Sequence, residues 1–342
     1  MKIEASRRLE HFQTGIFAAL NEKKEELLAS GKKIYNLSVG TPDFPVFDHI
    51  RKALMEAAQD PEKYHYTLRD LPELHEAVKD YYKKRFDVEI STDEIVAVPG
   101  SQEGVAHLGL TLCNPGDVVL LPNPGYPVFE VGAYLGGAEL YFYELREEND
   151  FLPKFDEIPE DIARRAKYIM VSYPYNPVCA VAPASFYEEL IAYAKKYNII
   201  VVHDNAYSDI IYDGVRGGSF LEFPGAKEVG IECFSLSKSF NLTGARVSFI
   251  IGNREIIDAV KLLRSQYDFG IFEPIQRAAI AALEGPLEPV REQCARYQER
   301  RDALCGGLRS IGWDVRDSQG TMFAWARIPE GFSSSQQFVM EL

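Results

Sequence analysis

Four short polar segments of this sequence have residue types and a spacing that could do chemistry. The first, Val98-Pro-Gly-Ser-Gln-Glu-Gly104, leads from an apolar, β-rich run through small residues into a helical pattern. Free backbone N–H groups at such a helix start can bind a phosphate. Taken alone, the same segment could be an ordinary helix entry.

The second and third segments carry an amide and a carboxylate. Asn176 lies in Ser172-Tyr-Pro-Tyr-Asn-Pro177, which on its own could be a simple turn. Asp204 lies in His203-Asp-Asn-Ala-Tyr207, directly after the most apolar run of the chain. A carboxylate buried there is costly unless it is paired. His203 is interpreted as a hydrogen-bonded core residue, and because the six histidines show no ligand spacing we predict no metal site.

The fourth segment carries an amine and is the most specific. Lys238 follows a β-rich run, lies between serines, and precedes Arg246 by eight residues. A lysine in an ordinary loop is solvated and has no such setting. Doubly wound folds place their ligand sites at strand ends, so we expect these segments to meet at one edge of a sheet.

The elements that must position these residues alternate between short β-rich runs and longer helical patterns. This alternation predicts an α/β fold with a mostly parallel, mixed sheet and helices on both faces. The candidate strands are Ile95–Val98, Val118–Leu121, Glu139–Tyr143, Tyr168–Ser172, Ile199–His203, Cys233–Ser235 and Val247–Ile251. The candidate helices are Leu71–Phe86, Gln102–Cys113, Ala184–Tyr197, Arg254–Gln266 and Glu273–Leu283.

The pattern changes in the last part of the chain. Leu287–Ile311 reads as one long charged helix, and Trp313–Val315 and Met322–Ile328 as two short strands of a smaller α+β domain. The predicted division is an N-terminal arm with part of the small domain (1–45), a large domain that contains the four segments (46–286) and a small C-terminal domain (287–342).

Composition narrows the function classes. Of 342 residues, 37 are basic and 51 acidic, which gives a net charge of −14 without any basic run, so a nucleic-acid partner is not expected. The N-terminal residues contain no apolar core of a signal peptide, and no apolar run is long enough for a membrane span. The five scattered cysteines are expected to be reduced. Together these features predict a cytoplasmic protein without a membrane partner.

Taken together, the four segments resemble the class I and II aminotransferases, enzymes of fold type I that depend on pyridoxal phosphate. The similarity runs from Asn36–Asp43 to Gly320–Trp325, and it is greatest to LL-diaminopimelate aminotransferases and related enzymes. It implies a fold type I sheet with a smaller domain, and a homodimer with shared active sites. It also implies ping-pong transfer of an amino group between an L-amino acid and a 2-oxo acid.

The resemblance assigns roles around the cofactor ring. Lys238 would bind the cofactor aldehyde covalently and then act as general acid and base. Asp204 would pair with the pyridine nitrogen and keep it protonated, so that the ring can accept electrons. Tyr207 and Asn176 would hydrogen-bond the phenolic oxygen, and Tyr126 would stack on the ring.

The resemblance also assigns the phosphate and substrate contacts. The phosphate would be held by Ser101, Gln102, Ser235, Ser237 and the fork of Arg246. Tyr66 would reach the phosphate of the neighbouring subunit, unless it is an ordinary surface aromatic. Gly40 and Asn176 would line the substrate pocket.

Two departures from the family pattern affect this interpretation. The family usually has Asn-Pro-Thr-Gly where this chain has Asn176-Pro-Val-Cys179, so the turn loses its glycine. The family also continues beyond Leu342 to an arginine that binds the substrate's α-carboxylate. We therefore expect the natural protein to be longer, and a protein ending here to be a weak transaminase unless Arg264 or Arg327 takes that role.

Two other functions fit the same cofactor residues. A C–S β-lyase shares the fold, and it differs in what leaves from the substrate's Cβ. A non-catalytic, cofactor-binding regulator is the second alternative, although such regulators carry a DNA-binding segment that is not evident in this sequence.

Overall fold

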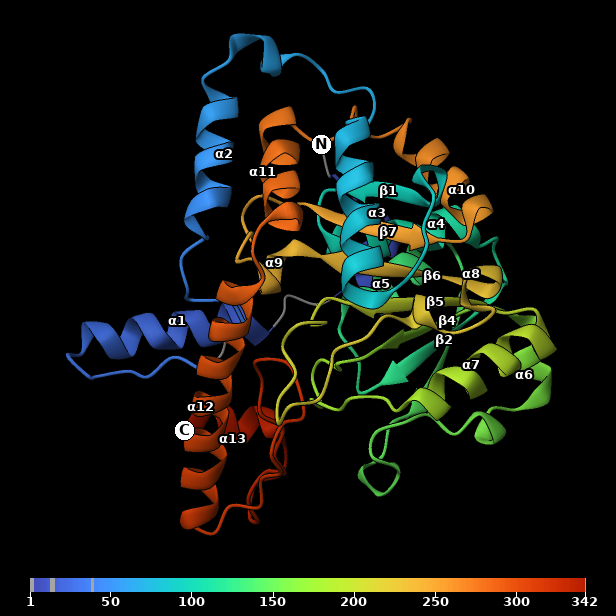
Figure 1. The fold of residues 1–342 in the computed structure, drawn as a ribbon. Helices are drawn as coiled ribbons and strands as arrows, with labels where there is room; N and C mark the ends of the chain where they lie inside the picture. The colour runs from blue at the N-terminus through green and yellow to red at the C-terminus, as the bar shows by residue number, and fades with distance from the viewer. Residues whose placement is uncertain (1–2, 13–15, 38–39, 342) are drawn as a thin grey trace. The chain divides into compact units, whose positions relative to one another are not determined.

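The computed structural model describes residues 3–12, 16–37 and 40–341, and a seven-stranded sheet forms its centre (Figure 1). The strand order is β1-β7-β6-β5-β4-β2-β3, in which β7 is antiparallel to both of its neighbours and the other pairs are parallel. The strands are β1 (Ile95–Val98), β2 (Val118–Asn123), β3 (Glu139–Glu144), β4 (Ala166–Ser172), β5 (Ile200–Asn205), β6 (Gly230–Ser235) and β7 (Ser248–Gly252). All seven predicted strands, and the predicted mixed sheet, are confirmed.

The helices include the five predicted for the sheet region. They are α1 (Ile16–Ala29), α2 (Asp48–Ala58), α3 (Pro72–Phe86), α4 (Ser101–Leu112), α5 (Val128–Leu135), α6 (Glu160–Arg165), α7 (Ala184–Tyr197), α8 (Ala226–Val229), α9 (Leu236–Ser239), α10 (Arg254–Arg264), α11 (Glu273–Glu284), α12 (Glu288–Ser310) and α13 (Ser335–Glu341). The long helix predicted near the C-terminus is confirmed as α12. Within the described ranges, no helix has both the length and the apolar character needed to cross a membrane.

Helices cover both faces of the sheet because successive strand residues point to opposite sides. Val96 and Val202 pack with apolar residues of α4, α5 and α10 on one face. Ala97 and Val201 belong to the core on the other face, which contains α3, α7 and α8. The central strand β5 is buried along most of its length, as its near-continuous apolar run predicts.

The two short strands predicted near the C-terminus are wrong. Trp313–Val315 and Met322–Ile328 form no strand in the described chain. The backbone between them bonds elsewhere: Gly320 bridges Ile211, and the Thr321 N–H donates to the Ile210 carbonyl at 2.8 Å. These groups are therefore engaged with the segment after β5, and a separate two-stranded ribbon would in any case be marginal.

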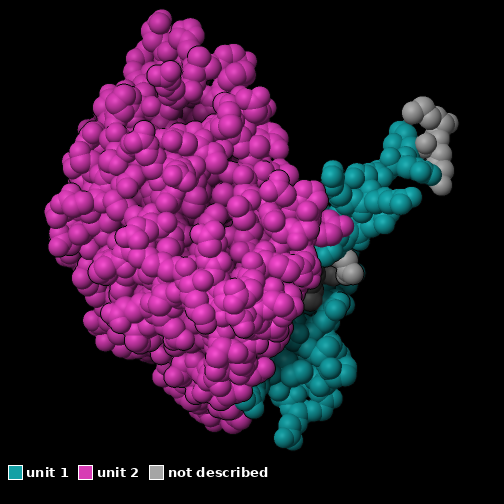
Figure 2. Space-filling view, turned by 90° about the vertical axis from the view of Figure 1, so that its right-hand side faces the viewer, with its two compact units in different colours: residues 1–41, 326–342 teal, residues 42–325 magenta. Residues whose placement is uncertain are grey.

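The chain divides into two compact units, residues 1–41 with 326–342 and residues 42–325 (Figure 2). The larger unit contains the sheet and every predicted site residue except Gly40. The division into domains at residues 45 and 286 stays a prediction.

A fully buried carboxylate, Glu232 in β6, joins several elements behind the sheet. It accepts hydrogen bonds from the Tyr82 hydroxyl at 2.7 Å, the Ser219 hydroxyl at 2.8 Å and the Phe220 N–H at 2.8 Å. His203 Nδ1 lies 3.0 Å from the same carboxylate, so His203 is the hydrogen-bonded core residue that was predicted. Burial alone would raise the pKa of Glu232, but the bonds from these partners hold it below its usual value.

We expect that removing one hydrogen bond to Glu232 lowers the free energy of unfolding more than removing a buried hydrogen bond to a neutral acceptor does. Tyr82→Phe should lower the free energy of unfolding by about 1.5–3 kcal/mol, because its partner is a buried carboxylate. The matched control is Tyr143→Phe, whose hydroxyl donates to the Met170 carbonyl at 2.5 Å. That change should cost about 0.5–1.5 kcal/mol in the same urea titration. Equal losses for the two variants would contradict an ionised Glu232.

Candidate active site

Three of the predicted residues meet at the carboxyl ends of two neighbouring strands. Asp204 lies in β5, with Tyr207 just beyond that strand, and Lys238 lies in α9 directly after β6. Because β5 and β6 are paired and parallel, their ends bring these side chains to one edge of the sheet. The Lys238 Nζ atom lies 6.0 Å from the centre of the Tyr207 ring.

The protonation of this group is strongly affected by burial. Burial raises the pKa of Asp204 to about 6, although the charges of His203 and Lys238 and a backbone hydrogen bond from Ala206 oppose the rise. Burial and the nearby Arg246 charge lower the pKa of Lys238, while Asp204 acts in the opposite direction. A lowered pKa leaves more of the amine in its neutral, nucleophilic form.

Asp204 has a further property that matters for binding. Its Oδ1 atom is buried and has no hydrogen-bond partner among the described residues. Buried polar groups in folded proteins are nearly always hydrogen-bonded, so this oxygen lies where a ligand would supply the missing donor.

A second cluster forms around the start of α4. Gly100 is the residue before the helix and has φ 92°, a conformation that favours glycine. A Cβ atom there would lie 2.2 Å from the Arg246 guanidinium, so the missing side chain is what lets the guanidinium approach the helix start. The Ser101 hydroxyl is buried at the same helix start and has no hydrogen-bond partner in the described part of the chain. The free N–H groups, the hydroxyl and the guanidinium together suit an anion.

The serines before Lys238 are fixed by each other and by the neighbouring strand. The Ser235 Oγ atom accepts a hydrogen bond from the Ser237 N–H at 3.1 Å. The Ser248 hydroxyl in β7 donates to the same oxygen at 3.2 Å. Ser248 was not predicted, because it lies on a different strand with no spacing signal in the sequence.

Tyr126 and Gln102 are in direct contact. The Tyr126 hydroxyl donates to Gln102 Oε1 at 3.1 Å. Burial raises the pKa of Tyr126, with a further increase from Asp204 and an opposing effect of Arg246. These influences link Tyr126 both to the Asp204 group and to the anion-binding cluster.

The loop after β4 carries Asn176 and lacks the expected glycine. Burial raises the pKa of Tyr207, and a hydrogen bond with Asn176 opposes the rise, so these two side chains are partners. Cys179 takes the place of the glycine with φ 64°, in the left-handed region. Its N–H donates to the Tyr175 carbonyl at 2.8 Å, so the tight turn is formed without glycine.

Tyr66 and Gly40 are the two remaining residues predicted for the site. The Tyr66 side chain is 80% exposed and packs against Phe269, with 4.9 Å between ring centres. Gly40 belongs to the smaller unit, and residues 38–39 of its predicted segment lie outside the described residues.

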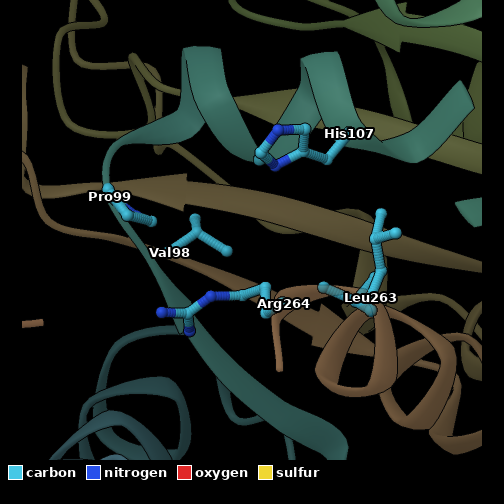
Figure 3. A pocket seen from close by; sticks show the side chains of 7 residues that line it. Val98, Pro99, His107, Leu263 and Arg264 are labelled. Carbon is cyan, nitrogen blue, oxygen red and sulfur yellow. The ribbon is translucent and has the colours of Figure 1, made fainter. Parts of the chain in front are cut away.

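A small cavity between α4 and α10 is lined by none of the residues predicted to bind the cofactor, although it includes Arg264 (Figure 3). Its lining consists of Val98, Pro99, Gly104, His107, Val260, Leu263 and Arg264. Arg264 is buried, donates to the Ala97 carbonyl and pairs with Asp268 at 2.7 Å. Its guanidinium is therefore engaged in holding the fold, and the suggestion that Arg264 anchors a substrate carboxylate finds no support.

Sequence reasoning also passed over Gln293 of α12. Its amide donates to the Lys238 carbonyl at 3.2 Å and its oxygen accepts from Asn241 at 2.7 Å. The lysine turn is thus held by a helix far along the chain, which no local pattern could reveal.

Comparison with known proteins decides the family. The family model of aminotransferases of class I and II matches residues 32–342. The chain belongs to this family. The LL-diaminopimelate aminotransferase of Dehalococcoides mccartyi is 42% identical over 99% of this chain and 88% of its own.

Solved structures of related proteins have the same fold. Substrate-bound BacF from Bacillus subtilis is 38% identical with a TM-score of 0.94, covering 99% of this chain and 86% of its own. A probable N-succinyldiaminopimelate aminotransferase from Thermus thermophilus is 34% identical with a TM-score of 0.90, covering 96% and 88%. The protein is accordingly a transaminase of fold type I that works with pyridoxal phosphate.

The site of this aminotransferase fits the cofactor. Two buried oxygens of the site lack hydrogen-bond partners among the described residues. Asp204 Oδ1 lies at the end of β5, and Ser101 Oγ lies in the anion-binding cluster at the start of α4. A protonated ring nitrogen and a phosphate are groups that would satisfy them. When bound, pyridoxal phosphate supplies a carbonyl for the substrate amine and a ring that withdraws electrons.

Burial of Asp204 should make the cofactor-free protein less stable as the pH rises. Its folded pKa of about 6 lies above the usual 3.8, so the folded state binds this proton more tightly than the unfolded chain. Stability linked to this group is therefore present below about pH 4 and is lost as the pH rises through 6. Each pKa unit corresponds to about 1.4 kcal/mol, which gives a penalty on the order of 3 kcal/mol.

We expect Asp204→Asn to remove that penalty. Without cofactor, the variant should be more stable than the wild type at about pH 8 and closer to it at about pH 4.5, as measured by urea unfolding. Comparing the two proteins at each pH cancels the other titrating groups. A stability difference that does not change with pH would contradict the buried, strained carboxylate.

Proposed function

We propose that this aminotransferase takes its amino group from LL-diaminopimelate or a closely related amino acid and gives it to a 2-oxo acid. The 42% identity to a relative of that name, over nearly the whole of this chain, supports this donor. We propose ping-pong kinetics, in which the oxo product of the donor leaves before the acceptor binds. Cytoplasmic location is part of the proposal and is supported by five cysteines that form no disulfide.

The unpartnered Oδ1 atom of Asp204, whose charge acts on Lys238, is the observation that carries the proposed mechanism. We propose that Lys238 would hold the cofactor through its amine. Once displaced by the substrate, the same amine would take the proton from the substrate's Cα and deliver it to the cofactor carbon that had carried the aldehyde. Asp204 would accept a hydrogen bond from the protonated ring nitrogen. Tyr207 and Asn176, already partners, would bond the ring's phenolic oxygen.

The remaining proposed contacts follow the two clusters of the site. Tyr126 would lie against the ring. The phosphate ligands would be Ser101, Gln102, Ser235, Ser237 and Arg246. Gly40 and Asn176 would line the substrate pocket, and residues 287–342 with the first 45 would form the small domain beside it.

We propose that the active form is a homodimer in which Tyr66 completes the partner subunit's phosphate site. Tyr66 lies in a surface group of aromatic side chains whose exposure supports an interface. The group consists of Tyr64, Tyr66, Tyr267, Phe269 and Phe272. Four of the rings pack in pairs, Tyr64 on Phe272 at 5.1 Å and Tyr66 on Phe269 at 4.9 Å, while the Tyr267 ring stacks on His107. Exposed clusters of large apolar side chains can mark interaction sites.

An assay with and without an acceptor tests the reaction. We expect the wild type to convert LL-diaminopimelate only when a 2-oxo acid is present, and Lys238→Ala to lose at least about a thousandfold in kcat, by analogy with other essential groups. Lys261→Arg is the control and should keep its activity. Pyruvate and ammonia released from a sulfur amino acid without any acceptor would indicate the β-lyase instead, and no turnover with a bound cofactor would indicate a regulator.

Mixing two defective subunits tests the shared site. Tyr66→Phe should weaken cofactor binding by about ten- to a hundredfold, because one charge-assisted hydrogen bond to the phosphate is lost. A hybrid of a Tyr66→Phe subunit with a Lys238→Ala subunit contains one site with both native residues. Activity at limiting cofactor should therefore return when the two variants are mixed, dissociated and allowed to re-associate. An active monomer in sedimentation, or no recovery in the mixture, would refute the shared site.

A further inference from the structure

Asp209 carries a nearly buried carboxylate to which the proposed mechanism gives no role. It lies two residues after Tyr207, and its side chain is 5% exposed. Arg85 of α3 donates to its Oδ1 atom from Nε at 3.1 Å, and Nη2 lies 3.1 Å from the same oxygen. A buried carboxylate needs such a counter-charge. Because the guanidinium binds Oδ1, the second oxygen is available to other donors.

That second oxygen joins the two turns of the active site. Asp209 Oδ2 accepts a hydrogen bond from the Ser239 hydroxyl at 2.8 Å and one from the Ser208 hydroxyl at 3.2 Å. Ser239 directly follows Lys238, and Ser208 directly follows Tyr207. One oxygen atom therefore connects the turn that carries the amine to the turn that carries the phenol.

The lysine turn depends on contacts of this kind for its position. α9 has only four residues, Leu236–Ser239, and a helix this short has no stability of its own. The Gln293 amide holds the Lys238 carbonyl at 3.2 Å from the α12 side. The shorter Ser239–Asp209 bond holds the other side of the turn, toward α3.

We propose that Asp209 is a positioning residue of this aminotransferase, which sets the place of Lys238 relative to Tyr207 through the Ser239 hydroxyl. Arg85 fixes the carboxylate that does this. The inference rests on the proposed role of Lys238 as the cofactor lysine. A misplacement of about 1 Å in a reacting group can cost about a hundredfold in rate, so a single bond beside the amine has a measurable effect.

Two serine variants isolate the bond that matters. Ser239→Ala and Ser208→Ala each remove one buried hydroxyl from the same carboxylate oxygen, and both leave the Arg85–Asp209 pair intact. Both serines are almost completely buried, which makes them a matched pair. Only one of them adjoins Lys238. A purely structural role would affect the two variants equally.

Three quantities should be measured for each variant. The first is the rate at which cofactor-free protein attaches pyridoxal phosphate, which absorbance can follow. The second is the pair of steady-state constants kcat and KM, and the third is the Tm. We expect Ser239→Ala to slow attachment and kcat by about ten- to a hundredfold, with a donor KM within about twofold of wild type. The rates of Ser208→Ala should stay within about twofold of wild type, and its Tm should be similar to that of Ser239→Ala.

Borohydride reduction of the wild type separates the two proposals. A pyridoxyl label on Lys238 supports the proposed function, and a label on another lysine, such as Lys261, overturns it. With the label on Lys238, equal rates for the two serine variants would overturn the positioning role alone. A Ser239→Ala protein that fails to fold while Ser208→Ala folds would assign the bond to stability, which also overturns it.

Discussion

The organisation of this protein depends on a buried carboxyl group at the end of its central strand, one oxygen of which lacks a hydrogen-bond partner among the described residues. This oxygen is the Oδ1 atom of Asp204, which follows a run of apolar residues into the interior. Such burial is unfavourable for an isolated carboxylate. Lys238, Tyr207 and Tyr126 all lie within its electrostatic influence. The surrounding fold keeps this carboxylate buried although its burial is unfavourable, and a protonated ligand would supply the missing hydrogen-bond donor.

Behind the same strand, a second buried carboxylate is arranged in the opposite way. Glu232 on β6 is saturated by donors from Tyr82, Ser219 and Phe220, with His203 as a further partner. Its role is to join α3 and the segment before α8 to the sheet. On one face of the β5–β6 pair the buried carboxylate thus receives several hydrogen bonds, while on the other face Asp204 leaves one oxygen open. This contrast separates the supporting side of the sheet from the binding side.

Much of this arrangement could be predicted from the sequence, because the decisive residues directly follow strands. Parallel strands end at one edge, so Asp204 and Lys238 had to be neighbours once β5 and β6 were paired. Helix α5 gives no such signal, since its run Val128–Leu135 is nearly all apolar and has no polar face to set a period. The contacts of Gln293 and Ser248 were equally invisible, because their partners lie elsewhere in the chain. The two strands predicted near the C-terminus do not form in the described chain. Between them, Gly320 bridges Ile211, and the Thr321 N–H donates to the Ile210 carbonyl.

The antiparallel direction of β7 limits where this chain can accept insertions and deletions. Because β7 runs antiparallel to β6, the chain turns back at one edge of the sheet, and Arg246 returns to the edge that Lys238 has just left. The lysine and the guanidinium therefore share a single short connection that never crosses the sheet. An insertion or deletion there would shift both groups at once. The length of this connection is therefore more restricted than the lengths of the crossover segments between the parallel strands. Those segments can lengthen at the opposite edge of the sheet without moving the site residues.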